Sequence, residues 1–290
     1  MLIRYINPLG YCDSVKNSIK QAMSIREKGI FDNIYIFGML AHNELLVEKL
    51  ADYKIQTIVS DNFLSPDILD NITHKDAVIL PSHGHFTDLT DELTRRQIRY
   101  FDLTCPYITK INHSLLTLDP KKKIIYIGKM NHTEATESFK YIKNDKFFID
   151  YKNFSLNKIP FFVEDNIVIT NQSSLSGEML KDIISQIKTK FINIEILDHT
   201  CKNIDYRIKQ TEYLTKFYDK TIILGSIHSS NANSILKAAN SANGHSYLIN
   251  SLEELVKIRL KNDDKILVVS STSFPSNEVD KIIDYLDKLW

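Results

Sequence analysis

Three cysteines recur along this chain at even spacing and in similar surroundings. Cys12, Cys105 and Cys201 lie 93 and 96 residues apart, close to thirds of the 290 residues, and the sequence has no other cysteine. The second and third end the pattern D-x-T-C, and the first ends a looser copy, L-G-Y-C. Thiolates are ligands of zinc and of iron–sulfur clusters, and three cysteines cannot all pair as disulfides. The spacing therefore predicts a metal centre that uses all three thiols.

The position of each cysteine before a helical pattern favours this chemistry. Pro106 follows Cys105, and proline is favoured at the first position of a helix because its missing N–H would have no partner there. Cys105 is therefore predicted at a helix N-terminus, where free amides and the helix dipole stabilise a thiolate. Three cysteines on a four-iron cluster would leave one iron open to a substrate. The alternative is that each cysteine is a small buried apolar residue.

The elements around the cysteines repeat three times. Each cysteine is followed by a helical pattern, a β-branched strand with a polar turn, and later a second strand with a polar turn. The first strands are expected at 34–38, 124–128 and 221–225, and the second at 77–80, 167–169 and 266–269. The first polar turns come 27 to 30 residues after the cysteine, and the second ones 68 to 72 residues after it. This common register indicates a threefold internal repeat.

The repeat predicts an α/β fold of three pseudo-threefold-related units. Short β-branched runs between helical segments are typical of buried parallel strands, and ligands gather beyond the carboxyl ends of such strands. We expect the units at 1–103 with Cys12, at 104–198 with Cys105, and at 199–290 with Cys201. If the units close around one axis, the cysteines meet and the six polar turns surround them.

The polar turns carry candidate anion-binding and acid–base residues. Imidazolium, hydroxyl and amide donors together suit a phosphate group. The strand-end residues with such donors are His42, His83, His132, Ser173, Ser229, Ser230, Asn231 and Ser273. Residues 229–231 also fit an ordinary helix N-cap, which is itself a site for anions. Six further histidines are expected to be surface or hydrogen-bonded core residues: His74, His85, His113, His199, His228 and His245.

Glu134 is the candidate proton carrier. It is the only acid in the central turn of the second unit, and a carboxyl group in a partly dry site can transfer protons. It follows His132 by two residues, and an extended pair at that spacing would point both side chains to one side. The alternative is a solvated loop glutamate.

The composition argues against nucleic-acid and membrane partners. The 36 basic residues balance the 36 acidic ones, so the chain lacks the basic excess of a nucleic-acid or membrane surface. No apolar run approaches the ~20 residues of a membrane helix. The first residues lack the apolar core of a secretory signal. We expect a cytoplasmic protein with reduced thiols.

These residues together resemble the 4-hydroxy-3-methylbut-2-enyl diphosphate reductase family, the last enzymes of the methylerythritol phosphate route to isoprenoids. The resemblance extends over essentially the whole chain and rests on the joint order of its motifs. They are G-Y-C at 10–12, A-H-N at 41–43, S-H-G at 82–84, D-L-T-C-P at 102–106, H-T-E at 132–134, Q-S-S at 172–174, D-H-T-C at 198–201, S-S-N at 229–231 and S-F-P at 273–275. The chain departs from the family at Ser14, Glu137 and Ser271, where glycine is usual, and after Cys201, where Arg207 alone remains of a longer motif.

The resemblance implies a trefoil around a central 4Fe–4S cluster. Cys12, Cys105 and Cys201 would hold the cluster, with one iron not bound by cysteine. The implied binders of the substrate diphosphate are His42, His83, His132, Ser229, Ser230, Asn231 and Ser273. Glu134 would donate the proton, helped by Ser173, which stands where the family usually has threonine.

The implied reaction removes an allylic hydroxyl reductively. Two electrons from a ferredoxin or flavodoxin would release the hydroxyl of the allylic diphosphate as water and give isopentenyl and dimethylallyl diphosphates. Two alternatives stay open. A diverged member of the family could keep the fold and cluster but act on another small phosphorylated compound, or as a sensor. A cysteine- or zinc-dependent hydrolase is disfavoured because the chain has no C-x-x-C spacing.

Overall fold

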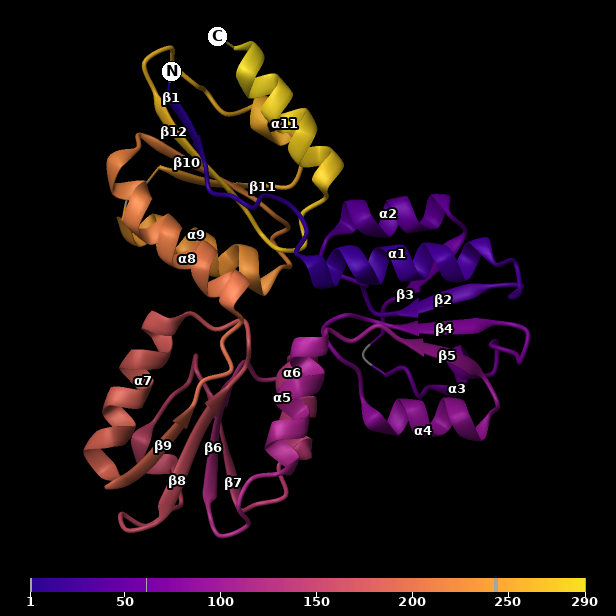
Figure 1. Cartoon of the computed structure of the whole chain (residues 1–290), viewed down its shortest axis with the longest axis vertical. Helices are drawn as coiled ribbons and strands as arrows, with labels where there is room; N and C mark the ends of the chain where they lie inside the picture. The colour runs from indigo at the N-terminus through magenta and orange to yellow at the C-terminus, as the bar shows by residue number, and fades with distance from the viewer. Residues whose placement is uncertain (1, 61, 243–244, 290) are drawn as a thin grey trace. The chain divides into compact units, whose positions relative to one another are not determined.

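The computed structural model describes residues 2–60, 62–242 and 245–289, and in them the strands form three four-stranded parallel sheets (Figure 1). Sheet B has the order β3 (Ile55–Ile58), β2 (Ile34–Phe37), β4 (Ala77–Leu80) and β5 (Arg99–Asp102). Sheet C has the order β7 (Lys146–Asp150), β6 (Lys123–Gly128), β8 (Asn166–Asn171) and β9 (Asn193–Leu197). Sheet A has the order β11 (Ser246–Ile249), β10 (Lys220–Leu224), β12 (Lys265–Ser270) and β1 (Leu2–Tyr5). The predicted parallel strands and the threefold repeat of strand order are confirmed.

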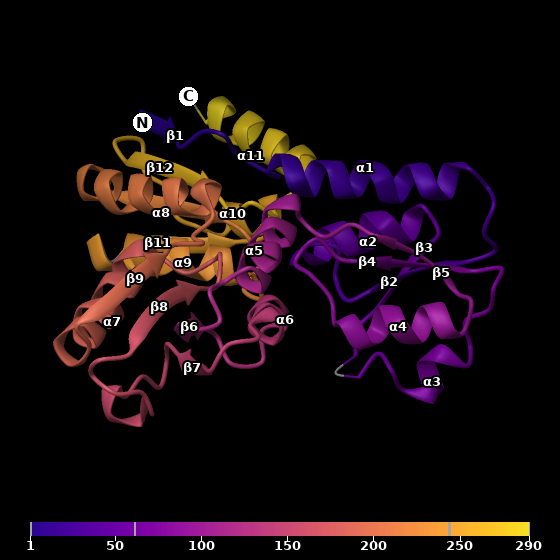
Figure 2. The same ribbon diagram turned by 60° about the horizontal axis from the view of Figure 1, so that its bottom comes forward.

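The strand that precedes each cysteine joins the sheet of the preceding repeat. β5, before Cys105, pairs with β4, and β9, before Cys201, pairs with β8. By the same plan β1, before Cys12, pairs with β12 near the other end of the chain (Figures 1 and 2). The first strand of the expected 1–103 unit therefore lies in the sheet of the last third, where it is the outer strand next to β12.

The helices also follow the repeat. Those directly after the cysteines are α1 (Asp13–Glu27), α5 (Pro106–Leu116) and α8 (Lys202–Leu214). Those after the first polar turns are α2 (Glu44–Asp52), α6 (Thr133–Tyr141) and α9 (Ser230–Ala242). The remaining helices are α3 (Pro66–Leu69), α4 (Thr87–Arg95), α7 (Gly177–Lys190), α10 (Leu252–Val256) and α11 (Ser276–Lys288), with short 3-10 turns at Leu156–Lys158 and Thr215–Phe217. None of the helices in the described ranges is long and apolar enough to span a bilayer.

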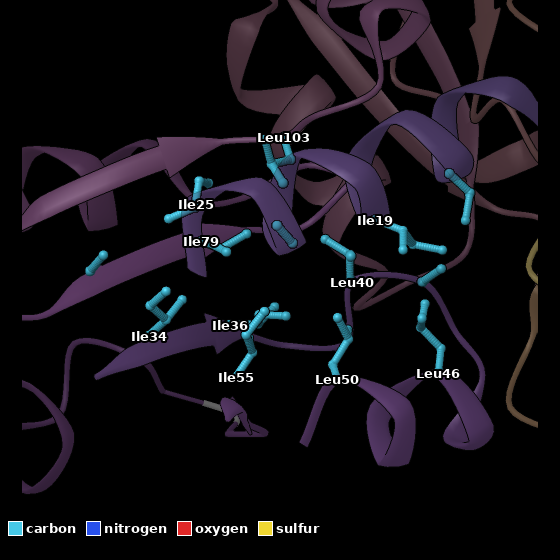
Figure 3. Packing of buried hydrophobic residues seen from close by; sticks show 14 of the residues in the cluster. Ile19, Ile25, Ile34, Ile36, Leu40, Leu46, Leu50, Ile55, Ile79 and Leu103 are labelled. Atoms are coloured by element: carbon cyan, nitrogen blue, oxygen red, sulfur yellow. The ribbon is translucent and has the colours of Figure 1, made fainter. Parts of the chain in front are cut away.

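Each sheet is covered by apolar helix faces. In sheet B, Ile19 and Ile25 of α1 pack with Ile36 of β2, Ile79 of β4 and Leu50 of α2 (Figure 3). Each of these side chains is less than 9% exposed, and full burial of one isoleucine or leucine contributes about 1.5–3 kcal/mol. Comparable clusters lie on sheets A and C. The rigid sheets hold the polar turns at their strand ends.

The described chain separates into two compact lobes. Lobe 1 comprises Met1–Ser82, Glu92–Leu103 and Lys202–Trp290, with sheets A and B, and lobe 2 comprises His83–Asp91 and Thr104–Cys201, with sheet C. The segment 83–91 thus belongs to lobe 2, although the expected division assigned it to the first unit. The terminal residues of that division, Met1 and Trp290, lie outside the described residues. The division into thirds stays a prediction.

Candidate active site

In lobe 2, Cys105 lies at a helix N-terminus, as predicted. It is the N-cap of α5 with φ −54° and ψ 127°, and Pro106 is the first helical residue. The carbonyl of Cys105 accepts the N–H of Thr109 at 3.1 Å, the first bond of the helix. Its thiol is partly exposed. The helix N-terminus therefore presents this thiol together with the amides of the first turn.

Cys201 is fixed by the turns around it. Its N–H donates to the carbonyl of Ser173 at 2.8 Å, at the turn after β8. The hydroxyl of Tyr107 in α5 donates to the carbonyl of Thr200 at 3.2 Å. The first turn of the Cys105 helix therefore contacts the residue before Cys201, and two of the three cysteines lie in one region of lobe 2.

Tyr107 is a residue to which the sequence assigned no role. Burial raises the pKa of Tyr107, and the nearby negative charges of Cys201, Asp198, Glu134 and Cys105 raise this pKa further. One phenol is thus within electrostatic reach of both cysteines and of the candidate acid. Its position two residues after Cys105 was the only signal in the sequence.

Glu134 is a buried carboxyl group and not a solvated loop residue. It is 4% exposed, and its Oε1 accepts the N–H of Ser173 at 2.6 Å. Burial raises the pKa of Glu134, and the hydrogen bonds from Ser173 oppose this rise. Since Ser173 also accepts the N–H of Cys201, one residue connects the candidate acid to a candidate cluster ligand.

The expected extended pair of His132 and Glu134 is wrong. His132 is the N-cap of α6 with φ −87° and ψ 128°, and the helix begins at Thr133. Glu134 is therefore a helical residue, because the chain turns into α6 directly after His132. The two residues still lie in the same N-terminal turn, and His132 is half-buried.

The end of β8 supports the turn at 198–201. The Asn171 side chain accepts the N–H of His199 at 3.1 Å and donates to Oγ1 of Thr200 at 3.2 Å. The His199 ring lies between Thr170 Oγ1 at 2.8 Å and Ser114 Oγ at 3.2 Å. His199 is thus a hydrogen-bonded core histidine, as expected. The role of Asn171 was missed because it depends on pairing between distant segments.

In lobe 1, Cys12 is the N-cap of α1 with φ −71° and ψ 166°. Its N–H donates to the carbonyl of Thr272 at 3.1 Å, in the turn after β12. The buried guanidinium of Arg207 donates to the carbonyls of Gly10 at 3.0 Å and Ser270 at 2.7 Å. Arg207 therefore joins the segment before Cys12 to the end of β12.

The turn after β12 also gathers polar candidates of lobe 1. Ser273 Oγ donates to the carbonyl of His42 at 3.3 Å, and Asn231 Nδ2 donates to Thr272 Oγ1 at 3.0 Å. Ser229 Oγ accepts the N–H of Ala232 at 3.3 Å, which makes Ser229 the cap of α9. The expected N-cap is confirmed, and helix N-termini attract anions. Three polar turns, after β2, β10 and β12, contribute to this region of lobe 1.

Two glycines allow helices to start close to strand ends. A Cβ atom at Gly225 would lie 2.6 Å from Cβ of Ala232 in α9, and one at Gly128 would lie 2.9 Å from Cβ of Ala135 in α6. By contrast, Ser14 lies in α1, where an ordinary helical backbone suits any L-residue. The loss of glycine there introduces no backbone strain.

The predicted site residues are divided between the lobes. Lobe 1 holds Cys12, His42, Ser229, Ser230, Asn231 and Ser273, and lobe 2 holds His83, Cys105, His132, Glu134, Ser173 and Cys201. In residues 2–60, 62–242 and 245–289, no group of three or more His, Cys, Asp or Glu side chains is arranged around one metal position. The meeting of the three cysteines stays a prediction.

The donor set nevertheless fits an iron–sulfur cluster chemically. Cys12 and Cys105 are helix N-caps, Cys201 directly precedes α8, and each of the three is partly exposed. Accessible cysteine sulfurs are the soft ligands that iron–sulfur clusters take. The fold and these residues define an α/β protein built from parallel-sheet repeats, each with a cysteine directly before a helix.

The comparison with protein families identifies the chain further. The family model described as "LytB protein" matches residues 3–287, and the chain therefore belongs to the LytB family. A relative from Wolbachia sp. subsp. Brugia malayi, named 4-hydroxy-3-methylbut-2-enyl diphosphate reductase, is 27% identical over 99% of this chain and 91% of its own length. One of the same name from Dictyoglomus turgidum is 28% identical over 100% and 98%. The chain covers only 32% of a longer relative of that name from Fusobacterium nucleatum.

Solved structures share the fold. The E-1-hydroxy-2-methyl-but-2-enyl-4-diphosphate reductase of Plasmodium falciparum matches with a TM-score of 0.85 at 24% identity, over 98% of this chain and 87% of that one. A second reductase structure, described as the terminal enzyme of the non-mevalonate pathway, matches with a TM-score of 0.70 at 19% identity, over 99% and 100%. The predicted α/β fold class is confirmed, and so is the family resemblance.

Proposed function

We propose that this chain is an iron–sulfur reductase that converts 4-hydroxy-3-methylbut-2-enyl diphosphate to isopentenyl and dimethylallyl diphosphates. Its family and its relatives' names support this activity. The observation that best supports the mechanism is that Ser173 contacts both Glu134 and Cys201. Its N–H holds the buried Glu134 carboxyl and its carbonyl holds the N–H of Cys201. A proton donor and a cluster ligand thus share one support.

The reaction requires electrons and protons in equal number. Two electrons and two protons break the allylic C–O bond, release the hydroxyl as water and place a hydrogen on the allylic carbon chain. A 4Fe–4S cluster, when bound, would pass on the electrons and offer one iron with a coordination position open to substrate. Cys12, Cys105 and Cys201 are the residues that would hold it.

Glu134 supplies the proton for the leaving hydroxyl in this proposal. Hydroxide is a poor leaving group in a dry pocket, so an acid must lie within hydrogen-bond reach of its oxygen. Burial raises the pKa of Glu134, which favours a protonated carboxyl that can donate. Ser173 keeps the carboxyl in place through its 2.6 Å hydrogen bond.

The diphosphate would be held by neutral and cationic donors. A buried diphosphate needs many hydrogen bonds, because unpaired charge is costly in a dry site. In lobe 1 the candidates are His42, Ser229, Ser230, Asn231 and Ser273, at the turns and the N-terminus of α9. In lobe 2 they are His83 and His132, of which His132 caps α6.

The electron donor and location belong to the same proposal. A one-electron carrier such as a ferredoxin or flavodoxin suits a cluster that accepts electrons singly. A cytoplasmic location suits three thiols that must stay reduced to bind iron.

An anaerobic turnover assay tests the proposal. The reconstituted protein is mixed with 4-hydroxy-3-methylbut-2-enyl diphosphate and reduced methyl viologen, and the diphosphates are separated by mass spectrometry. We expect both five-carbon products. A protein that shows cluster absorbance but no turnover would be the diverged family member. A protein without cluster absorbance would be neither the reductase nor that diverged member.

A further inference from the structure

A buried carboxylate that the proposed mechanism does not use lies one turn after Glu134. Glu137 in α6 is 2% exposed, and its Oε2 accepts the N–H of Thr87 at 3.1 Å. Thr87 is the first residue of α4. The carboxylate therefore caps a helix that is 50 residues away in sequence, at the end where the helix dipole favours negative charge.

Lys140 completes the contact. Its Nζ lies 2.9 Å from Oε1 of Glu137, 5.0 Å from the centre of the Phe86 ring and 3.9 Å from Oδ2 of Asp88. A buried carboxylate needs a charged partner, and a cation above an aromatic ring gains further attraction. Two residues of α6 thus hold three consecutive residues of another segment, 86–88.

The held segment begins with His83. Residues 83–91 pack with lobe 2 although they follow β4 of lobe 1 in sequence. Gly84 has a φ of +97°, a left-handed conformation that glycine adopts without steric cost, so the chain can turn sharply next to His83. The attachment at Thr87 is therefore a side-chain contact that holds this segment against α6, in addition to the burial of Leu89.

The helix that provides the attachment is itself held. Ser138 Oγ donates to Oδ1 of Asn112 in α5 at 2.7 Å, and α5 and α6 lie side by side in both views (Figures 1 and 2). α6 therefore connects the Cys105 helix on one side with segment 83–91 on the other. The same helix carries Glu134 and is capped by His132.

We propose that Glu137 and Lys140 are positioning residues that fix the His83 segment against the helix of His132 and Glu134, and so set the affinity for the substrate diphosphate. Neither residue needs to touch the substrate. The effect on substrate affinity rests on the proposed function, whereas the effect on the segment itself does not.

Amide hydrogen exchange of the reconstituted protein tests the positioning directly. In Glu137→Ala the peptide covering 84–91 should exchange about tenfold faster, since loss of a helix cap of this kind costs roughly one factor of ten in the local opening constant. Peptides of α5 and α7 should exchange as in the unchanged protein. Glu164→Ala, which removes an exposed carboxylate of the same lobe, should leave all peptides unchanged.

Kinetics separate positioning from general stability. Glu137→Ala and Lys140→Met should raise KM for the allylic diphosphate about tenfold with kcat within twofold, and Lys143→Met, at an exposed lysine, should change neither. Glu137→Gln keeps an acceptor for the Thr87 N–H and should give a smaller rise. If Glu137→Ala fails to fold, Glu137→Gln and Lys140→Met still decide the question.

The outcomes are distinct. Unchanged exchange at 84–91 in Glu137→Ala, or faster exchange everywhere, would overturn the positioning role. Faster exchange confined to 84–91 with unchanged KM would remove the link to substrate binding. If exchange at 84–91 is faster in Glu137→Ala as expected, but the wild-type protein shows no turnover, the proposed function would be contradicted and the segment attachment would remain supported.

Discussion

Replacement of Glu134 by glutamine removes the carboxylic acid while nearly preserving the shape of the side chain. The carboxyl is 4% exposed and accepts one short N–H bond, from Ser173 at 2.6 Å. Glutamine keeps an oxygen for that bond and has nearly the same volume, so no cavity is created and the Ser173 N–H keeps its acceptor. The substitution removes the transferable proton. General acid catalysis contributes about 10²–10⁴-fold, and we expect kcat to fall by about that factor with the iron content unchanged.

The assay is steady-state turnover with reduced methyl viologen, followed by iron quantification of the same sample. Glu164→Gln is the matched control, because that glutamate is exposed in the same lobe. It should retain the full rate. A Glu134→Gln protein with normal iron and a rate within a few-fold of the unchanged enzyme would refute the role of Glu134 as acid.

The pH dependence of stability gives a second readout of the same carboxyl. Burial raises the pKa of Glu134 in the folded protein above that of the unfolded chain, which is about 4.3. The folded state then holds the proton more tightly, so this stabilisation is complete below the unfolded pKa and is lost as pH rises through the folded pKa. The unchanged protein should lose stability relative to Glu134→Gln across that window. Equal thermal midpoints of the two at every pH would contradict the raised pKa.

Three further substitutions test other parts of the site. Ser273→Ala should raise KM for the diphosphate about 10- to 100-fold at similar kcat, because a hydrogen bond to a charged group contributes ~1.5–3 kcal/mol, and unchanged affinity measured by calorimetry would exclude it as a binder. Gly225→Ala should lower the free energy of unfolding, measured in urea, by about 1–3 kcal/mol, because the new Cβ would lie 2.6 Å from that of Ala232. An unchanged free energy of unfolding would show that α9 moves to make room. Arg207→Met should lower the free energy of unfolding of the iron-free protein by about 2–4 kcal/mol, because two hydrogen bonds to backbone carbonyls are lost. The reconstituted variant should also contain less iron, because the segment before Cys12 is held less firmly. An unchanged free energy of unfolding would contradict this.

Local patterns in the sequence were sufficient to predict the repeated helices and strands. Cys105 before Pro106 predicted a helix start, and β-branched runs such as 124–128 predicted buried parallel strands, because both depend on neighbouring residues alone. The extended reading of Glu134 was wrong because His132, two residues before it, is the N-cap of a helix, and no serine, threonine, aspartate or asparagine stands at that position to mark the start.

Tertiary closure could not be predicted in the same way. The strand at 2–5 pairs with β12, more than 250 residues further along the chain, and nothing near residue 2 indicates this partner. Likewise, Glu137 departs from a pattern that usually has glycine, and only the fold reveals that its carboxylate reaches Thr87. The Asn171 contacts with the turn at 198–201 depend on the same kind of long-range pairing.

The central claim is that Cys12, Cys105 and Cys201 together hold one iron–sulfur cluster. Iron and acid-labile sulfide per chain, measured with the visible spectrum after anaerobic reconstitution, test it in the unchanged protein and in the three single Cys→Ser variants. We expect about four irons per chain and absorbance near roughly 400 nm in the unchanged protein, and marked loss of both in each variant, because every thiolate serves the same cluster. A Cys12→Ser protein that retains full iron and full absorbance would contradict the claim.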